Sequence, residues 1–108
     1  MGNNTGTEVV EKPKAKTKKP RQYQVLLLND DYTSMDFVVM VLESIFQKAP
    51  AEAVQIMLNV HQKGSGVCGV YTKEIAEAKV EAVHRRAREN GFPLKATCLL
   101  YTSPSPRD

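Results

Sequence analysis

Four polar residues have the clearest potential for chemistry: the run Asn29-Asp30-Asp31 and the histidine His61. Amide and carboxylate oxygens accept hydrogen bonds, and a neutral imidazole adds one more acceptor. Together they could hold a cationic group such as a protonated amine. Each part alone has a simpler interpretation, because Asn and Asp favour turns and a single histidine on an apolar helical face is more often a core or boundary residue.

Two methionines strengthen the case for a pocket. Met35 and Met57 begin two apolar helical faces, and methionine is used both in cores and on adaptable binding surfaces. Met57 and His61 are one helical turn apart and share a face, with Val60 beside it. A strand-end loop and the helix after it can place Asn29, Asp31 and Met35 opposite. The expected pocket is polar at its rim and apolar at its floor.

The elements that position these residues follow from periodicity. Residues 23–28 predict a buried strand that ends at the polar loop. Thr33 is expected to cap a helix that runs to about Lys48, with Asp36 in the capping-box position. Pro50 suits the first position of a second helix, and Gly64 suits its end. The expected apolar face of that second helix consists of Val54, Met57, Leu58 and His61.

The second half of the chain predicts a strand, a helix and a strand. The strand spans residues 67–71, and Thr72 caps a helix that Gly91 ends. The last strand runs from Leu94 to about Leu99. The order β-α-α-β-α-β predicts an α+β fold: one small sandwich in which a three-stranded antiparallel sheet packs against three helices.

Charge is distributed unevenly along the 108 residues, whose net charge is +3. Residues 1–22 hold six Lys and Arg against two Asp and Glu, and the remainder holds nine against ten. The basic character therefore belongs to an N-terminal arm, and residues 1–20 are predicted to be disordered because they lack apolar periodicity. This arm is either an interaction segment or a solubilising leader.

The last residues differ in character from the rest. Residues 98–108 (CLLYTSPSPRD) resemble a translated sequencing-library adapter. We therefore expect a non-native or disordered tail there, a folded domain over residues 21–97, and a native sequence that differs after about Thr97.

Several motifs together resemble the ClpS family. These are NDDYT-x-M, V-H-x-x-G, C-G-V-Y-T and A-R-E-N, in that order, within the segment from about Arg21 to Thr97. Such a set is far more specific than any one short motif. ClpS is the bacterial adaptor that delivers N-degron substrates to the ClpA unfoldase of the ClpAP protease, so the resemblance implies that role here.

The resemblance also implies site residues. Four would hold the free α-amino group of a substrate: Asn29, Asp30, Asp31 and His61. Seven would form the pocket for a first side chain of Leu, Phe, Tyr or Trp: Leu28, Thr33, Met35, Val38, Met57, Val60 and Leu94. Met35 stands at the family's gatekeeper position, where it would exclude β-branched Ile and Val. Glu74 and Lys79 would contact the N-terminal domain of the unfoldase. The unfoldase would also engage the N-terminal arm of this protein.

The expected protein is not an enzyme and needs no cofactor or metal. It is expected to be a cytoplasmic monomer without nucleic-acid or membrane partners, since the first twenty residues lack a secretory signal and Cys68 alone remains outside the suspect tail. Three alternatives stay open. These are a general interaction domain of the same fold, like the C-terminal domain of the ribosomal stalk protein; a metal enzyme that uses Asp30, Asp31 and His61; and a nucleic-acid binder that acts through the arm.

Overall fold

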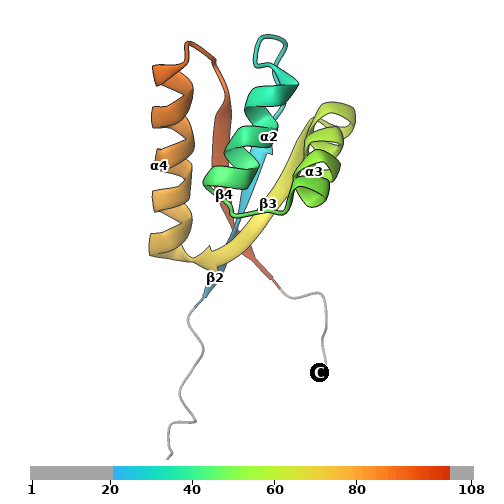
Figure 1. Ribbon diagram of the computed structural model, residues 1–108. Helices are drawn as coiled ribbons and strands as arrows, with labels where there is room; N and C mark the ends of the chain where they lie inside the picture. The colour runs from blue at the N-terminus through green and yellow to red at the C-terminus, as the bar shows by residue number, and fades with distance from the viewer. Residues whose placement is uncertain (1–20, 103–108) are drawn as a thin grey trace, which may run out of the picture.

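The computed structural model describes residues 21–102, and the arm expected over residues 1–20 lies outside them. The elements are β2 (Gln22–Leu28), α2 (Met35–Ser44), α3 (Pro50–Lys63), β3 (Ser65–Thr72), α4 (Lys73–Glu89) and β4 (Lys95–Tyr101). The expected order and fold class are confirmed. Figure 1 shows the three helices on one face of the sheet.

The sheet has the order β3-β2-β4, and β2 pairs antiparallel with both neighbours. Leu28, the last residue of β2, lies opposite Ser65 and Lys95, the first residues of the other two strands. The loop after β2 therefore emerges where both neighbouring strands begin. Val25 and Leu27 point toward the helices and are fully buried, because alternate residues of a strand face opposite sides.

The last strand is longer than expected. Residues 98–101 continue β4, and Cys98 lies opposite Val25 of β2. Regular structure thus extends four residues past the domain boundary expected at Thr97. The physical reason is that residues 22–25 of β2 offer backbone hydrogen-bond partners to residues 98–101. Residues 103–108 lie outside the described part of the chain.

Helix α2 begins one residue later and ends earlier than its periodicity predicts. Ser34, not Thr33, is the N-cap, and its hydroxyl accepts a hydrogen bond from the amide of Phe37 at 3.1 Å. The helix ends at Ser44 rather than near Lys48. Gln47 has a φ of 52°, which turns the chain sharply toward the start of α3. Such a turn depends on tertiary partners, which a hydrophobic pattern does not contain.

Helix α3 has the expected ends but a different buried face. Pro50 begins it, and Gly64 ends it with a φ of 91°. Val54 is 42% exposed, whereas Ala53 and Ile56 are buried with the expected Met57. The helix is therefore rotated from the expected orientation, which leaves His61 exposed near its last turn instead of on the apolar face.

One glycine sets the distance between α3 and β3. A Cβ atom on Gly66 would lie 2.8 Å from Cγ2 of Val60 and 3.4 Å from the carbonyl oxygen of Ile56. Only a residue without a side chain allows this approach. The close packing of α3 on β3 therefore depends on Gly66.

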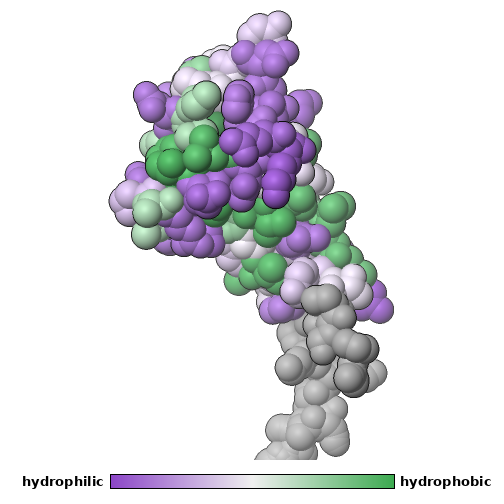
Figure 2. Space-filling view, turned by 90° about the vertical axis from the view of Figure 1, so that its right-hand side faces the viewer, coloured by the Kyte–Doolittle hydropathy of each residue, from purple (hydrophilic) through white to green (hydrophobic). Residues whose placement is uncertain are grey.

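Among residues 21–102, no helix covers the opposite face of the sheet (Figure 1). Val67, Val70 and Leu99 are exposed large apolar residues of β3 and β4. In Figure 2, hydrophobic residues gather in the lower part of the coloured surface. Within residues 21–102, no helix is both long and apolar enough to cross a membrane.

Candidate functional site

A hollow of about 380 Å³ lies beside the loop that follows β2. The loop forms one wall, and α2 and α3 contribute the others. A much smaller recess of about 10 Å³ lies next to it. The hollow is lined by Asn29, Asp30, Asp31, Tyr32, Thr33, Ser34, Met35, Val38, Met57, Val60 and His61. The recess adds Leu28 and Leu94.

The loop is held by its own hydrogen bonds. One carboxylate oxygen of Asp30 accepts from the amides of Tyr32 and Thr33, at 2.7 Å each. The other accepts from the Thr33 hydroxyl, also at 2.7 Å. The backbone amide of Asn29 donates to the carbonyl of Gly64 at 2.9 Å, which ties the loop to the end of α3. The loop is thus fixed on both sides before any ligand arrives.

These bonds decide the charge state of Asp30. Partial burial raises the pKa of its carboxyl group, but the hydrogen bonds from Thr33 and Tyr32 stabilise the carboxylate and together outweigh burial. The pKa therefore lies below its ordinary value of 3.8. The carboxylate that holds the loop is ionised at neutral pH, and its oxygens are already engaged within the loop.

The remaining polar groups face solvent at the rim of the hollow. Asn29, Asp31 and His61 are all exposed, and no hydrogen bond of these three side chains is found within residues 21–102. His61 lies near the end of α3, three residues before the Gly64 carbonyl that binds the loop. The amide, the carboxylate and the imidazole are therefore available to a ligand.

Apolar side chains form the interior of the hollow and the recess. Val38, Met57, Val60 and Leu94 are all buried, with exposed fractions of 9% or less. Met35 differs, because 49% of its surface is exposed at the first turn of α2. It therefore stands at the mouth of the hollow, where it can contact a ligand and still reach solvent.

The structure brings all eleven expected ligand residues together in the hollow and its recess. Two lining residues, Tyr32 and Ser34, were not expected. Tyr32 is 79% exposed and contributes a free phenol ring to the loop. The sequence signal that could have identified Tyr32 as a lining residue is its position between Asp31 and Thr33, two predicted site residues.

Glu74 and Lys79 lie elsewhere, in the first half of α4, whose start is at the far end of the molecule from the loop (Figure 1). Glu74 is exposed. The Lys79 ammonium donates to the carbonyl of Ile45 at 2.6 Å and to Oε1 of Gln47 at 3.2 Å. It therefore satisfies a carbonyl at the end of α2 and fixes the turn that leads to α3.

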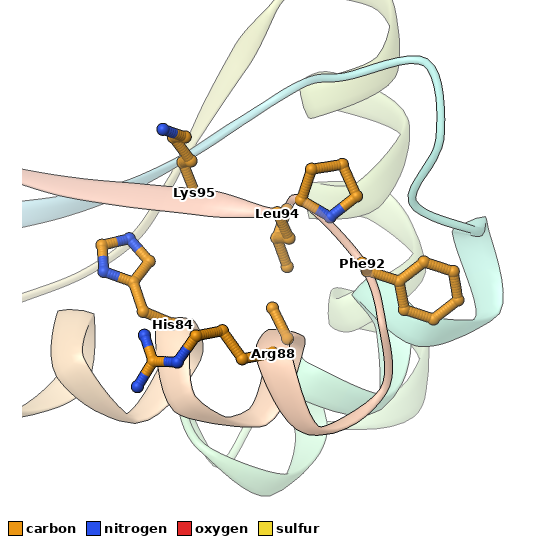
Figure 3. A pocket seen from close by; sticks show the side chains of 7 residues that line it. His84, Arg88, Phe92, Leu94 and Lys95 are labelled. Carbon is orange, nitrogen blue, oxygen red and sulfur yellow. The ribbon is translucent and has the colours of Figure 1, made fainter.

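A separate hollow of about 290 Å³ lies between α4 and the start of β4 (Figure 3). Nε2 of His84 accepts a hydrogen bond from the Ala96 amide at 3.0 Å, so this imidazole covers the edge of β4. Leu94 is the single lining residue that it shares with the expected site. No group of three or more His, Cys, Asp or Glu residues suited to a metal ion occurs within residues 21–102.

The arrangement suits the capture of a cation attached to an apolar group. Three exposed acceptors meet at the rim, where they could bind the three donors of an ammonium group. The adjoining hollow has an apolar interior large enough for one bulky side chain. The N-terminal residue of a polypeptide has both features, since its α-amino group is charged and its side chain leaves the same carbon.

Comparison with known proteins gives a consistent result. The family described as "ATP-dependent Clp protease adaptor protein ClpS" matches residues 18–97. The ClpS adapter of Oleidesulfovibrio alaskensis is 64% identical over 80 residues, 74% of this chain and 77% of that protein. The ClpS adapter of Desulfatibacillum aliphaticivorans is 56% identical over 90 residues, 83% of this chain and 86% of that protein.

A solved structure agrees as well. Agrobacterium tumefaciens ClpS2 bound to L-phenylalaninamide is 37% identical, with a TM-score of 0.75 over 77% of this chain and 100% of that one. The family match ends at Thr97, where the sequence changes character. It includes every expected site residue. The chain belongs to the ClpS family of Clp protease adaptors.

Proposed function

We propose that this protein binds the free N-terminal amine and bulky first side chain of N-degron substrates and delivers them to the unfoldase of a Clp protease. The observation that carries the proposal is the juxtaposition at one hollow of three unengaged acceptors, Asn29, Asp31 and His61, with a buried apolar interior. Family membership supports the same role. The protein acts by binding, without a catalytic step.

Recognition of the amine depends on its charge and its donors. Asn29 offers an amide oxygen, Asp31 a carboxylate directly or through water, and neutral His61 one ring nitrogen. Acetylation of the substrate removes the charge and two donors, so it abolishes binding. The His61 imidazole accepts through its unprotonated ring nitrogen.

Selection of the side chain depends on burial and shape. Burial of about 150–250 Å² of a Leu or aromatic side chain against Val38, Met57 and Val60 gives roughly 4–6 kcal/mol before the costs of association. Those costs leave an affinity in the micromolar range. Met35 at the mouth rejects Ile and Val, because their β-branched side chains would clash with it. Such a steric clash discriminates between side chains more strongly than the gain or loss of one methylene contact.

The test is a titration of fluorescent peptides monitored by anisotropy. A peptide that begins with Phe is compared with its acetylated form and with one that begins with Ile. We expect binding of the first alone, and equal binding of all three refutes the proposal. His61→Ala is expected to weaken binding about tenfold or more, because a hydrogen bond to a charged group is lost. His84→Gln is the matched control, since an amide oxygen can still accept from Ala96.

The delivery step needs a second surface. We assign it to the exposed side of α4 near Glu74, far from the loop, so that an unfoldase can dock while the substrate is bound. The unfoldase is of the ClpA type, contacted through its N-terminal domain, and the adaptor acts as a cytoplasmic monomer. Glu74→Lys is expected to abolish co-migration with that domain in gel filtration and to leave peptide binding unchanged.

A further inference from the structure

The hollow between α4 and the start of β4 has no role in the proposed function. Its volume is about 290 Å³, and Leu94 is the only residue that it shares with the linings of the first hollow and its recess. The other lining residues come from α4, from the loop after it and from the first residue of β4, and none of those within residues 21–102 is acidic. The charges and hydrogen-bond donors of this wall therefore indicate what it binds.

Two side chains of α4 provide hydrogen-bond donors at one end of this hollow. His84 and Arg88 are four residues apart, so they lie on the same side of the helix, and Figure 3 shows the Arg88 guanidinium beside the His84 ring. Nε2 of His84 accepts from the Ala96 amide at 3.0 Å, so the ring carries its proton on Nδ1. The Nδ1–H group and the guanidinium have no acceptor within residues 21–102. Both can donate to a ligand.

The backbone adds a third donor. Leu94 is 3% exposed, and its amide donates no hydrogen bond within residues 21–102. The N–H groups of residues two apart in an extended chain point to the same side, and the N–H of Ala96 points to His84. The Leu94 N–H is therefore expected to face the same hollow. A buried donor without an acceptor costs free energy, so an oxygen atom of a ligand is favoured there.

Apolar groups occupy the rest of the wall. Ala87 and Leu94 are both buried and line the hollow. Phe92 lies at the other end of the hollow from His84 (Figure 3), and its ring packs on Phe37 with 4.7 Å between the centroids. Its amide donates to the carbonyl of Ala87 at 2.9 Å, which fixes the loop on α4. The hollow therefore has donors at one end and a firmly held apolar surface beside them.

The neighbouring charges leave Arg88 as the main charge at this hollow. Lys95 points to the other side of β4 in Figure 3, where it lines a different hollow together with the Asp30-Asp31 pair. Two exposed acidic residues of α4 are close in sequence, but neither lines the hollow. Glu81 precedes His84 by one helical turn, and Glu89 pairs with the arginine three residues before it at 4.0 Å. A bound anion therefore meets a cation and no carboxylate.

We propose that this hollow is a second binding site, which takes a carboxylate of a peptide. Arg88, His84 and the Leu94 amide donate to the carboxylate oxygens, because a planar carboxylate matches the forked guanidinium. The apolar group next to the carboxylate packs against Ala87 and Leu94. The carboxylate belongs either to the C-terminus of a chain or to an acidic side chain, since both present the same two oxygens. The inference does not depend on the proposed function, because no residue expected to hold the substrate amine lines this hollow.

The test is a titration of the isotope-labelled protein with three small probes, followed by NMR chemical shifts of the backbone amides. All three probes are acetylated, so they lack the amine that the first hollow is proposed to hold. N-acetylleucine has a chain-end carboxylate, N-acetylglutamic acid α-amide has a side-chain carboxylate, and N-acetylleucinamide has none. We expect saturable shifts of the Leu94 and Ala96 amides with at least one acid, at a dissociation constant in the millimolar range.

The acid that produces the larger shifts identifies the source of the carboxylate. The proposal is overturned if neither acid shifts these two amides. It is also overturned by equally large shifts with N-acetylleucinamide, or with potassium chloride at the same ionic strength, because the carboxylate is then not what the hollow recognises.

The role of Arg88 is tested by removal of its charge. Arg88→Gln is expected to weaken binding of the preferred acid about threefold or more, the size of a partly screened ion pair. Arg85→Gln is the matched control, since it removes the same charge from an exposed residue of α4 that does not line the hollow. An equal loss in both variants means a general field effect and overturns the assignment. Affinity for a Phe-initiated peptide should be unchanged in both variants, and its loss in Arg88→Gln would overturn the separation of the two sites.

Discussion

The contact between α3 and β3 offers a direct test of how the fold positions the site. In Gly66→Ala, the new methyl group would lie 2.8 Å from Cγ2 of Val60, which is 0.6 Å inside the 3.4 Å at which ordinary contact begins. Val60 is β-branched and 3% exposed, so it has no alternative rotamer in free space. The carbonyl oxygen of Ile56 lies 3.4 Å from the same methyl position, so the backbone of α3 is already in contact with it. Helix α3 must therefore move outward.

Overpacking of this kind costs about 1–3 kcal/mol, and the loss of glycine freedom in the unfolded chain returns about 0.4–1 kcal/mol. We expect a net loss of stability of about 1–2 kcal/mol, with a fall in melting temperature of about 4–8 °C for each kcal/mol in a domain of this size. Because Val60 and Met57 line the hollow from α3, affinity for a Phe-initiated peptide should fall as well.

Calorimetry and peptide anisotropy measure the two effects. The matched control is Gly66→Ala combined with Val60→Ala, which removes the methyl group that clashes. The double variant should be more stable than the sum of the two single effects predicts. Strict additivity, or a Gly66→Ala protein as stable as the natural one, would show that the helix is not held against the strand by this contact.

Three further predictions follow from the hydrogen bonds and burial described above. Because the folded-state pKa of Asp30 is lowered, its contribution to stability is present above pH 3.8 and is lost as the pH falls through the lower folded-state value. Thr33→Val removes one of the hydrogen bonds that lower this pKa, so it should move the loss of stability to higher pH. An acid limb of the stability profile that is unchanged in this variant would contradict the prediction. Lys79→Met should lower the free energy of unfolding in urea by about 1–2 kcal/mol, because the Ile45 carbonyl loses its hydrogen-bond partner. An unchanged midpoint would show that Lys79 is not needed for stability and can instead contact a partner protein. Burial raises the pKa of the Cys68 thiol to about 12. In a variant that lacks the other cysteine, iodoacetamide at pH 8 should therefore modify Cys68 only as fast as the protein unfolds. Rapid alkylation of the folded variant would refute the burial of Cys68.

Much of the fold was predictable from local signals. The run from Tyr23 to Leu28, Pro50 at a helix start and the stops at Gly64 and Gly91 depend on propensity and backbone freedom, which are properties of neighbouring residues. The family resemblance also predicted eleven residues that the structure places together in the hollow and its recess. What motifs alone did not contain is the availability of each group.

The tertiary structure decided which groups remain free. Asp30 is named by the motif with Asp31, yet its carboxylate is engaged by Tyr32 and Thr33 while Asp31 stays exposed. Lys79 shows the same effect at the end of α2, where it satisfies a backbone carbonyl distant in sequence. Hydrogen-bond partners brought together by folding cannot be counted from a linear pattern.

The orientation of α3 illustrates the same division. Pro50, Gly64 and the helical spacing of the apolar residues between them are enough to predict a helix over residues 50–63. Only the close approach that Gly66 permits decided which side of that helix is buried, since it turns Val60 onto β3 and leaves His61 at the rim of the hollow. The spacing of apolar residues predicts the buried side of a helix only to within about one residue position. Steric contact with the neighbouring strand decides which residues are buried.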